Sequence, residues 1–265
     1  MKKILLFLFV SITCSVSYAV GALGTDKLTC ERLENPLGID TKTPAFSWTL
    51  IAAERNQSQT AYELIVSDNM NDVNAGRGNV WTSGKISSAQ GQYIIYKGVA
   101  LSSFTRYYWR IKVYDKKGEA SSWSKTAWFE TAFLDPAEWK ASWIGDGSKN
   151  PERDEDYYKD DRMPLVRKEF AVSKKLVTAR LYISGLGYYE AYLNGKKISD
   201  NVLDPGFTTY RKEVLYVVHD ITPLVSKGQN VMGVMLGSGW WNPLPFKFFG
   251  RWDLRDYQQI GRAHV

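Results

Sequence analysis

The sequence is poor in the residues that form disulfides and zinc sites. It contains two cysteines and two histidines in 265 residues. Cys14 lies in an N-terminal segment with the features of a removable signal, so Cys30 is the only thiol expected in the mature chain. A single thiol excludes an internal disulfide, and the Cys and His spacings of zinc sites are absent. We therefore expect each domain to be stabilised by an apolar core, and we predict no metal site.

Long hydrophobic runs are also missing. The apolar run at the N-terminus, Ile4–Val10, follows Lys2 and Lys3 and precedes a stretch of small residues. It is much shorter than the ~20 residues that a membrane-spanning helix needs. This pattern predicts a secretory signal peptide over residues 1–19, with a second cleavage position after Ala22. We therefore expect an exported protein, periplasmic or extracellular, without a transmembrane segment.

A strong excess of charge of one sign is absent as well. The formal net charge of +6 falls to about +3 when Lys2, Lys3 and Arg262, which lie in the predicted signal and in the last six residues, are left out. So small an excess argues against a nucleic-acid partner. The motifs of serine hydrolases, zinc proteases, phosphate-binding loops and dinucleotide folds are absent too. We therefore assign no catalytic residue, and the motifs indicate no cofactor.

The last six residues, 260–265, continue no pattern found upstream. Their sequence, IGRAHV, is what one reading frame of a common short-read sequencing adapter encodes. We interpret residues 260–265 as a sequencing artefact, with genuine protein ending near Gln258 or Gln259. The alternative is an authentic short C-terminus. Under the first interpretation His264 has no functional meaning, and His219 is the only genuine histidine.

Aromatic residues, by contrast, are abundant: the chain has 10 Trp and 16 Tyr. Over residues 27–132, short segments with alternating apolar side chains follow one another and are separated by Gly and Pro. In YYWRIKVYD, for example, Tyr107 and Trp109 fall on one face of a strand. This rhythm predicts an all-β fibronectin type III/Ig-like sandwich with Trp48 and Trp109 in its core.

The alternation returns at Leu165, after an acidic stretch. The carboxylates of that stretch, from Glu152 to Asp161, lack the spacing of a calcium loop and are interleaved with Lys and Arg, which favours a solvated loop. Further on, Asn194-Gly195 is a strong hairpin signal. Over residues 138–259, strands joined by hairpins and longer crossings predict a jelly-roll β-sandwich. We expect this sandwich to be incomplete, with its remaining strands beyond residue 259.

Sugar binding is the function that the residues of this second domain favour, because aromatic side chains with amides and acids nearby suit a pyranose ring. Trp240, Trp241 and Asn242 follow a Gly-Ser-Gly turn and are the candidate carbohydrate-binding residues. Asn194 and Asp204 are weaker candidates. The alternative is that the two tryptophans pack in a core or between domains, and that Asn194 and Asp204 only shape turns.

Several segments carry a family resemblance. Residues 185–242, GLGYYEAYLNGKKISDNVLDPGFTTYRKEVLYVVHDITPLVSKGQNVMGVMLGSGWWN, closely resemble the N-terminal β-sandwich region of bacterial α-L-rhamnosidases in glycoside hydrolase family 78. Upstream, NPLGID, PAFSWTL, WTSGKI and RYYWRIKVYD resemble the fibronectin-like module that precedes it in the same enzymes. Together the resemblance covers most of residues 28–258. The one departure is Ile198-Ser199-Asp200, where the family has a Val-Gly-Asp turn.

The resemblance implies inverting hydrolysis of terminal α-L-rhamnosyl residues in rhamnose-containing glycans or glycosides. It also implies that the general acid and base lie in an (α/α)₆ barrel further along the chain. This fragment would then lack the catalytic domain and be inactive. Related jelly rolls bind carbohydrate, some of them through calcium, and we expect no other cofactor. The competing hypothesis is a free-standing secreted carbohydrate-binding or adhesive β-sandwich protein.

Overall fold

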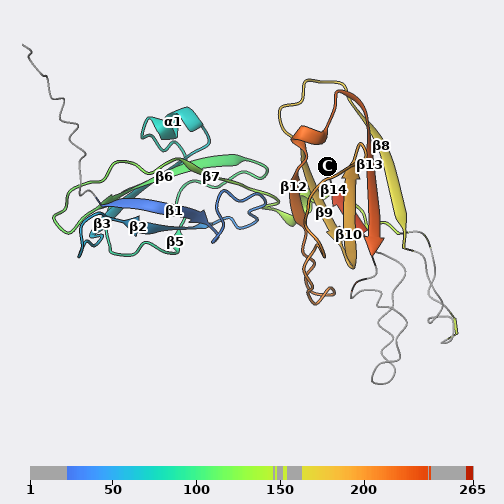
Figure 1. Ribbon diagram of the computed structural model, residues 1–265, viewed down its shortest axis with the longest axis horizontal. Coiled ribbons are helices and arrows are strands. Elements are labelled where there is room, and N and C mark those ends of the chain that lie inside the picture. The colour runs from blue at the N-terminus through green and yellow to red at the C-terminus, as the bar shows by residue number, and fades with distance from the viewer. Residues whose placement is uncertain are drawn as a thin grey trace, which may run out of the picture. The chain divides into compact units, whose positions relative to one another are not determined.

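The computed structural model describes residues 23–145, 147, 152–153, 163–237 and 239, and the backbone of residues 261–264. The chain divides into two compact units (Figure 1). The first consists of Met1–Pro36, Thr43–Ala100 and Arg106–Phe129, and the second of Leu37–Lys42, Leu101–Thr105 and Glu130–Val265. Two short loops, Leu37–Lys42 and Leu101–Thr105, thus belong to the second unit although the chain on either side of them belongs to the first.

The described part of the chain is built from strands. Its helical residues are confined to one short helix, α1 (Met70–Asn74), and to two 3-10 turns, Pro136–Glu138 and Thr222–Leu224. None of its helices is long and apolar enough to cross a membrane. The predicted all-β class is therefore confirmed.

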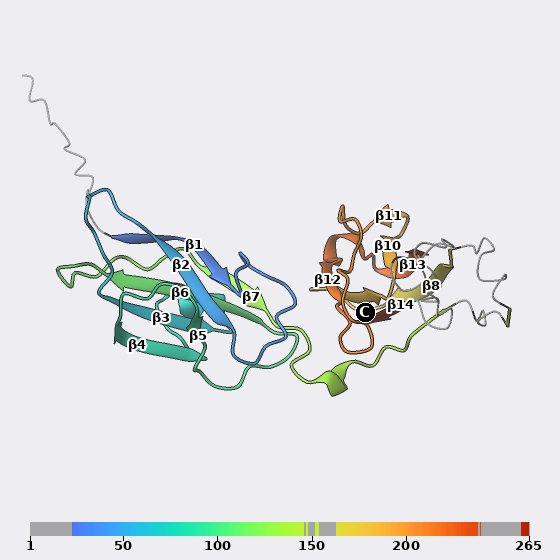
Figure 2. The same ribbon diagram turned by 90° about the horizontal axis from the view of Figure 1, so that it is seen from below.

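The first unit is a sandwich of two sheets, with strand orders β1-β2-β5 and β4-β3-β6-β7 (Figure 2). Its elements are β1 (Gly24–Cys30), β2 (Ala45–Ile51), β3 (Ala61–Ser67), α1 (Met70–Asn74), β4 (Trp81–Ser87), β5 (Ile94–Ile95), β6 (Arg106–Tyr114) and β7 (Ala127–Glu130).

The core of this sandwich follows the alternation seen in the sequence. Along β6 every second side chain is buried, beginning with Tyr107. Trp48 and Trp109 are 3% and 0% exposed, which confirms the predicted tryptophan core. The Phe46 ring lies between the sheets with its centroid 4.7 Å from that of Trp109. Cys30 is a free, buried thiol, and burial raises its pKa above the ordinary value.

The second unit is also a sandwich, with strand orders β11-β10-β13-β8 and β12-β9-β14. Its strands are β8 (Leu165–Val172), β9 (Arg180–Gly185), β10 (Tyr188–Leu193), β11 (Lys196–Lys197), β12 (Val217–Asp220), β13 (Gly228–Gly237) and β14 (Gly261–His264). The predicted hairpin joins β10 to β11, with positive φ angles of 53° at Asn194 and 80° at Gly195. Two left-handed residues in succession are what a two-residue turn of this kind requires.

The backbone of Gly261–His264 pairs with β9 as β14. Main-chain hydrogen bonds do not depend on the side chains that the paired strands carry, so an open sheet edge accepts many extended segments. The pairing therefore does not bear on the origin of these residues, and their interpretation as a sequencing artefact stays a prediction.

Strand β9 is buried on both faces. Leu181 and Ile183 face the core between the two sheets, together with β10 and β13. Tyr182 faces the other way, into a second apolar cluster with Ala132 and Phe133. A strand of an antiparallel sandwich commonly buries one face and leaves the other to solvent. The outer face is buried because the chain after β7 and the loops 37–42 and 101–105 pack against it.

A buried ion pair fastens this packing. The Arg180 guanidinium donates to both carboxylate oxygens of Glu130, at 2.6 and 2.9 Å, and its Nη1 lies 2.8 Å from Asp220 Oδ1. The side chains of Arg180 and Glu130 are only 9% and 10% exposed. Burial alone would lower the pKa of Arg180, but the hydrogen bond and charge of Glu130, with the charge of Asp220, raise it.

The loop 37–42 is held close to β12 by its backbone. Ile39 forms a parallel bridge with Thr131, in which its amide donates to Glu130 O at 3.0 Å and its carbonyl accepts from Ala132 N at 2.7 Å. Beside it, Gly38 has a φ of +83°, and a Cβ there would lie 2.8 Å from Val218 Cγ2. Only glycine fits both the backbone conformation and the close approach.

We predict that Gly38→Ala destabilises the second unit more than Gly195→Ala does. Both glycines have a left-handed φ, +83° and +80°, so alanine costs about 1–2 kcal/mol of strain at each. A Cβ at Gly195 meets nothing within 4 Å, whereas one at Gly38 clashes with Val218. Denaturant unfolding measures the difference, and equal losses of stability would show that loop 37–42 does not pack as described.

Candidate functional site

An aromatic pocket of about 570 Å³ lies on the outer face of the β9-β12 pair. All of its lining residues belong to the second unit. They come from loop 37–42, from the segment that follows β7, and from the second sheet: Asp40, Lys42, Phe133, Leu134, Pro136, Trp139, Trp143, Ser184, Val214 and Tyr216. We call this the aromatic pocket.

One wall of the aromatic pocket is a cluster of packed rings. Phe133, which is 8% exposed, lies at its centre, with its centroid 4.6 Å from that of Trp139 and 5.7 Å from that of Tyr216. Trp139 and Tyr216 also contact each other, at 5.5 Å. Trp143 adds a fourth ring, and Trp139, Trp143 and Tyr216 are half-buried. Half-buried rings keep part of their surface available to a ligand.

Strand pairing explains why the sheet contributes Ser184 and Tyr216. Val218 pairs with Tyr182 across β12 and β9, so these residues lie on the outer face. Residues two positions away along extended chain share that face, which places Tyr216 and Ser184 beside them. The Ser184 hydroxyl donates to Leu215 O at 2.6 Å. Ser184 therefore shapes the floor of the pocket with its hydroxyl already used.

The segment that carries Trp139 is fixed by a capped turn. Asp135 Oδ1 accepts from Ala137 N at 2.9 Å, and Glu138 Oε2 accepts from Asp135 N at 3.3 Å. This reciprocal arrangement is a capping box on the 3-10 turn Pro136–Glu138. Glu138 also accepts from the Ser103 hydroxyl at 2.5 Å, which ties the turn to loop 101–105.

The lining of the pocket includes one acidic and one basic side chain. Asp40 and Lys42 are exposed and come from one short loop. Burial raises the pKa of the Tyr216 hydroxyl, the charge of Asp40 and the hydroxyl of Tyr182 add to the rise, and the Phe133 backbone opposes it. Tyr216 is therefore a neutral phenol at physiological pH. The hydroxyl of Tyr216 is itself buried, so the pocket offers one carboxylate and one ammonium beside the aromatic rings.

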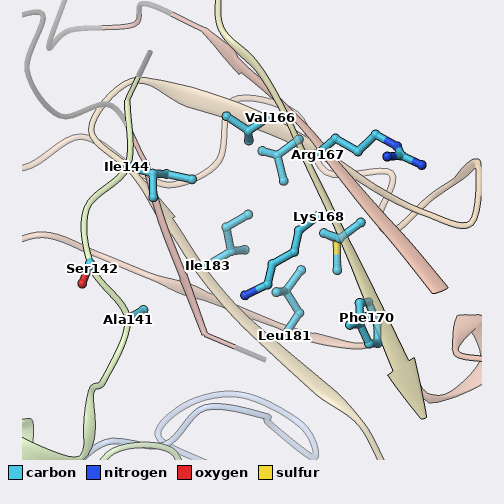
Figure 3. Close-up of a pocket in the computed structure, with 11 residues that line it drawn as sticks. Ala141, Ser142, Ile144, Val166, Arg167, Lys168, Phe170, Leu181 and Ile183 are labelled. Atoms are coloured by element: carbon cyan, nitrogen blue, oxygen red, sulfur yellow. The ribbon is translucent and has the colours of Figure 1, made fainter. Parts of the chain in front are cut away.

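A second pocket, of about 700 Å³, lies between the two sheets of the second unit. Figure 3 shows it between β8, which carries Val166 and Phe170, and the inner face of β9, which carries Leu181 and Ile183. Lys168 points into this space and Arg167 points away from it (Figure 3). The lining is otherwise almost entirely apolar, so this pocket suits hydrocarbon better than the many hydroxyls of a sugar.

Both units match known protein families. Residues 25–135 match the family described as "Rha78A-like, N-terminal immunoglobulin domain", and residues 174–258 match the "Alpha-L-rhamnosidase N-terminal domain". The chain matches the N-terminal region of the α-L-rhamnosidases. The family resemblance and the predicted pair of an Ig-like sandwich and a second β-sandwich are thereby confirmed, whereas the jelly-roll strand order stays a prediction.

Individual α-L-rhamnosidases show the same extent of similarity. One from Formosa agariphila is 36% identical over 236 residues, which are 83% of this chain and 25% of that protein. The solved structure from "Dictyoglumus thermophilum" is 36% identical with a TM-score of 0.75, over 90% of this chain and 27% of that one. That from Aspergillus terreus is 26% identical with a TM-score of 0.71, over 91% and 26%. This chain spans about a quarter of the curated relatives' length.

The strongest sequence-based prediction of a sugar site, Trp240, Trp241 and Asn242, lies outside the described residues. So do the predicted signal peptide and most of the acidic stretch between residues 152 and 161. Within the described residues no group of His, Cys, Asp and Glu could hold a metal ion. The predicted sugar site and the predicted signal peptide are therefore not tested by the described residues, and they remain predictions.

Asn194 has a structural role in the rhamnosidase-type second sandwich. Its Oδ1 accepts from Val231 N at 2.9 Å, and its Nδ2 donates to Leu224 O at 3.0 Å and to Asn230 Oδ1 at 2.9 Å. Asn230 is fully buried and binds the backbone around Ser226. The amide of Asn194 thus links the hairpin to β13, and its role as a sugar ligand is untested.

Asp204 lies elsewhere, in a small recess that does not include Asn194. Its Oδ2 accepts from Asn201 Nδ2 at 2.9 Å, and its peptide bond to Pro205 is cis. The recess holds only about 10 Å³, room for a water molecule and not for a sugar ring. Asn194 and Asp204 are therefore not brought together, and neither lines the aromatic pocket.

The same recess contains a buried histidine. His219 Nε2 lies 2.9 Å from the Tyr189 hydroxyl, and both residues are less than 9% exposed. Burial lowers the pKa of His219, and the charge of Asp204 partly opposes this. Burial also raises the pKa of Tyr189, as does Asp204. The pair is therefore most stable with both groups neutral.

The sequence analysis did not find the aromatic pocket. Trp139 and Trp143 lie at the start of the predicted second sandwich, before its first alternating segment at Leu165. Asp40 and Lys42 lie almost a hundred positions away from these tryptophans, and no local pattern connects the two loops. The one available signal was the spacing of Trp139 and Trp143 in a segment that otherwise lacks strand alternation.

We predict that the second unit loses stability as the pH falls below about 6.5, the ordinary pKa of histidine. Because His219 has a lowered pKa in the folded state, the unfolded chain binds the proton first, and protonation favours unfolding. Denaturant unfolding between pH 7.5 and 5 measures this dependence. His219→Gln should have a flatter profile, and parallel profiles would show that His219 does not contribute.

Proposed function

We propose that this chain is the accessory N-terminal region of a secreted α-L-rhamnosidase. The whole protein would hydrolyse terminal α-L-rhamnosyl residues of glycans or glycosides with inversion at the anomeric carbon. The observation that carries the proposal is the match of both units, in order, to the N-terminal quarter of α-L-rhamnosidases. Export rests on the signal pattern of residues 1–19.

The geometry supports an accessory role and not a catalytic one. Inverting hydrolysis needs two carboxyl groups about 6.5–9.5 Å apart, with a sugar and a water between them. The lining of the aromatic pocket contains one carboxylate, Asp40. The recess at Asp204 is lined by a second, Glu190, but it has room for only one water.

Glu190 is also engaged as a structural anion. It accepts from the Lys197 ammonium and from the Tyr192 hydroxyl, each at 2.8 Å. The hydrogen bonds from Lys197 and Tyr192 lower its pKa. A general acid needs the opposite, a raised pKa that keeps its proton until the leaving oxygen takes it. The acid and base of the proposed reaction are therefore assigned to the catalytic domain of the same protein.

A free-standing carbohydrate-binding or adhesive protein is the second candidate. The aromatic pocket favours it, because sugar binding needs no catalytic domain. The partial coverage of the relatives favours the first candidate. Reading the gene past the codon for Gln259 separates them, since only an accessory region is followed by a helical catalytic domain.

We predict that the 265-residue chain does not hydrolyse an aryl α-L-rhamnoside, because its described residues hold no acid and base pair. A chain extended to the full length of its relatives should release rhamnose first as the β anomer, which proton NMR detects directly. The control is an identical preparation from host cells without the gene. Turnover by the 265-residue chain above that control would contradict the assignment, and release of the α anomer would contradict inversion.

A further inference from the structure

We propose that the aromatic pocket is a non-catalytic binding site for the pyranose ring of a neutral glycoside, with rhamnosides as its ligand class. The residues described as lining it do not include the sequence-predicted Trp240, Trp241 and Asn242, which lie outside the described residues. The choice of rhamnosides rests on the proposed function. The choice of a neutral pyranose rests on the pocket alone.

The size and the lining of the pocket suit a small polar ring. Its volume of about 570 Å³ falls in the usual range for small-molecule sites. A pyranose has an apolar face of C–H groups that stacks on aromatic rings and a rim of hydroxyls that needs polar partners. Trp143 and Tyr216 provide the first of these surfaces, and Asp40 and Lys42 provide the second.

The charges favour a neutral ligand. Asp40 and Lys42 stand two positions apart in one loop and carry opposite charges. A charged ligand would be attracted by one of them and repelled by the other. A ring with neighbouring hydroxyls can donate a hydrogen bond to the carboxylate and accept one from the ammonium. The loop therefore matches a polyol better than an acid or an amine.

The pocket is held in place before any ligand binds. Loop 37–42 is fixed by the Ile39–Thr131 bridge and by the close approach of Gly38 to Val218. The turn before Trp139 is fixed by its capping box. A site whose parts are already ordered loses little conformational entropy on binding, which suits a ligand as small as a monosaccharide.

The pocket between the sheets does not compete for this ligand. Its polar side chains are Ser142, Arg167 and Lys168, and Arg167 points away from it (Figure 3). Burying several sugar hydroxyls there would leave them without hydrogen-bond partners. Among the described residues, the aromatic pocket is the better site for a sugar.

The test is titration calorimetry of the full chain with methyl α-L-rhamnopyranoside and, separately, with methyl α-D-glucopyranoside. Trp143→Ala should weaken binding by ~10-fold or more, as expected for loss of a stacking ring. Asp40→Asn should also weaken it, through loss of the charged acceptor. Because Asp40 is exposed, this variant keeps the fold and remains informative even if Trp143→Ala unfolds the second unit.

The matched control is Trp128→Ala in the first unit. Trp128 is also half-buried, and it packs under Arg106 with no part in the aromatic pocket. Its removal should leave binding unchanged. Thermal melts of all three variants separate loss of binding from loss of folding.

Each outcome decides the proposal. Rhamnoside binding that is lost in Trp143→Ala and Asp40→Asn but kept in Trp128→Ala supports it. No binding of either glycoside, or binding that the pocket variants leave unchanged, overturns it without touching the rhamnosidase assignment, which depends on turnover by the extended chain. Binding of the glucoside alone overturns rhamnosides as the ligand class.

Discussion

The buried pair of Arg180 and Glu130 is the interaction on which the second unit depends. Two charges removed from water are costly unless their geometry is close to ideal, and here the guanidinium meets both carboxylate oxygens and also reaches Asp220. Arg180 is the first residue of β9, and Glu130 begins the long stretch of the chain that forms the second unit. The pair therefore fixes the end of β7 beside the first residue of β9, and with it the position at which the following segment begins to pack on β9.

The position of that segment determines the aromatic pocket. From Glu130 the chain runs through Thr131, which bridges to Ile39, and on to Phe133, which packs on Tyr182 with ring centroids 5.0 Å apart. One contact brings in the loop that carries Asp40 and Lys42, and the other anchors the ring cluster. A site assembled from three distant parts of the sequence thus follows from one charged contact and the backbone bridges beside it.

Features that depend on neighbouring residues could be predicted from the sequence. The aromatic pocket and the packing on the outer face of β9 could not, because they are assembled from distant segments. The alternation of β6 and the Asn194-Gly195 hairpin depend on neighbouring residues and were predicted correctly. The second buried face of β9 depends on which segments pack on it, and the run from Leu181 to Ser184 has no pattern that reveals this. Asp204 was noticed for its acid group, yet its surroundings, Tyr189 and His219, are set by strand pairing. Trp139 and Trp143 follow no strand period and precede the first alternating segment of the second sandwich, so no local pattern marked them as part of a site.

The most direct test of this account is the unfolding free energy of Glu130→Gln, with Glu169→Gln as its control. Glu169 pairs with Arg167 at 2.6 Å, which is as close as Glu130 lies to Arg180. The side chains of Arg167 and Glu169, however, are 64% and 59% exposed. Glu130→Gln should lower the free energy of unfolding by about 3 kcal/mol, the lower end of the range for breaking a buried pair, because the buried guanidinium keeps only the half-exposed Asp220 as a counter-charge. Glu169→Gln should change it by less than about 1 kcal/mol, since water solvates the partner. Small and equal changes in both variants would contradict the claim that this pair holds the second unit together.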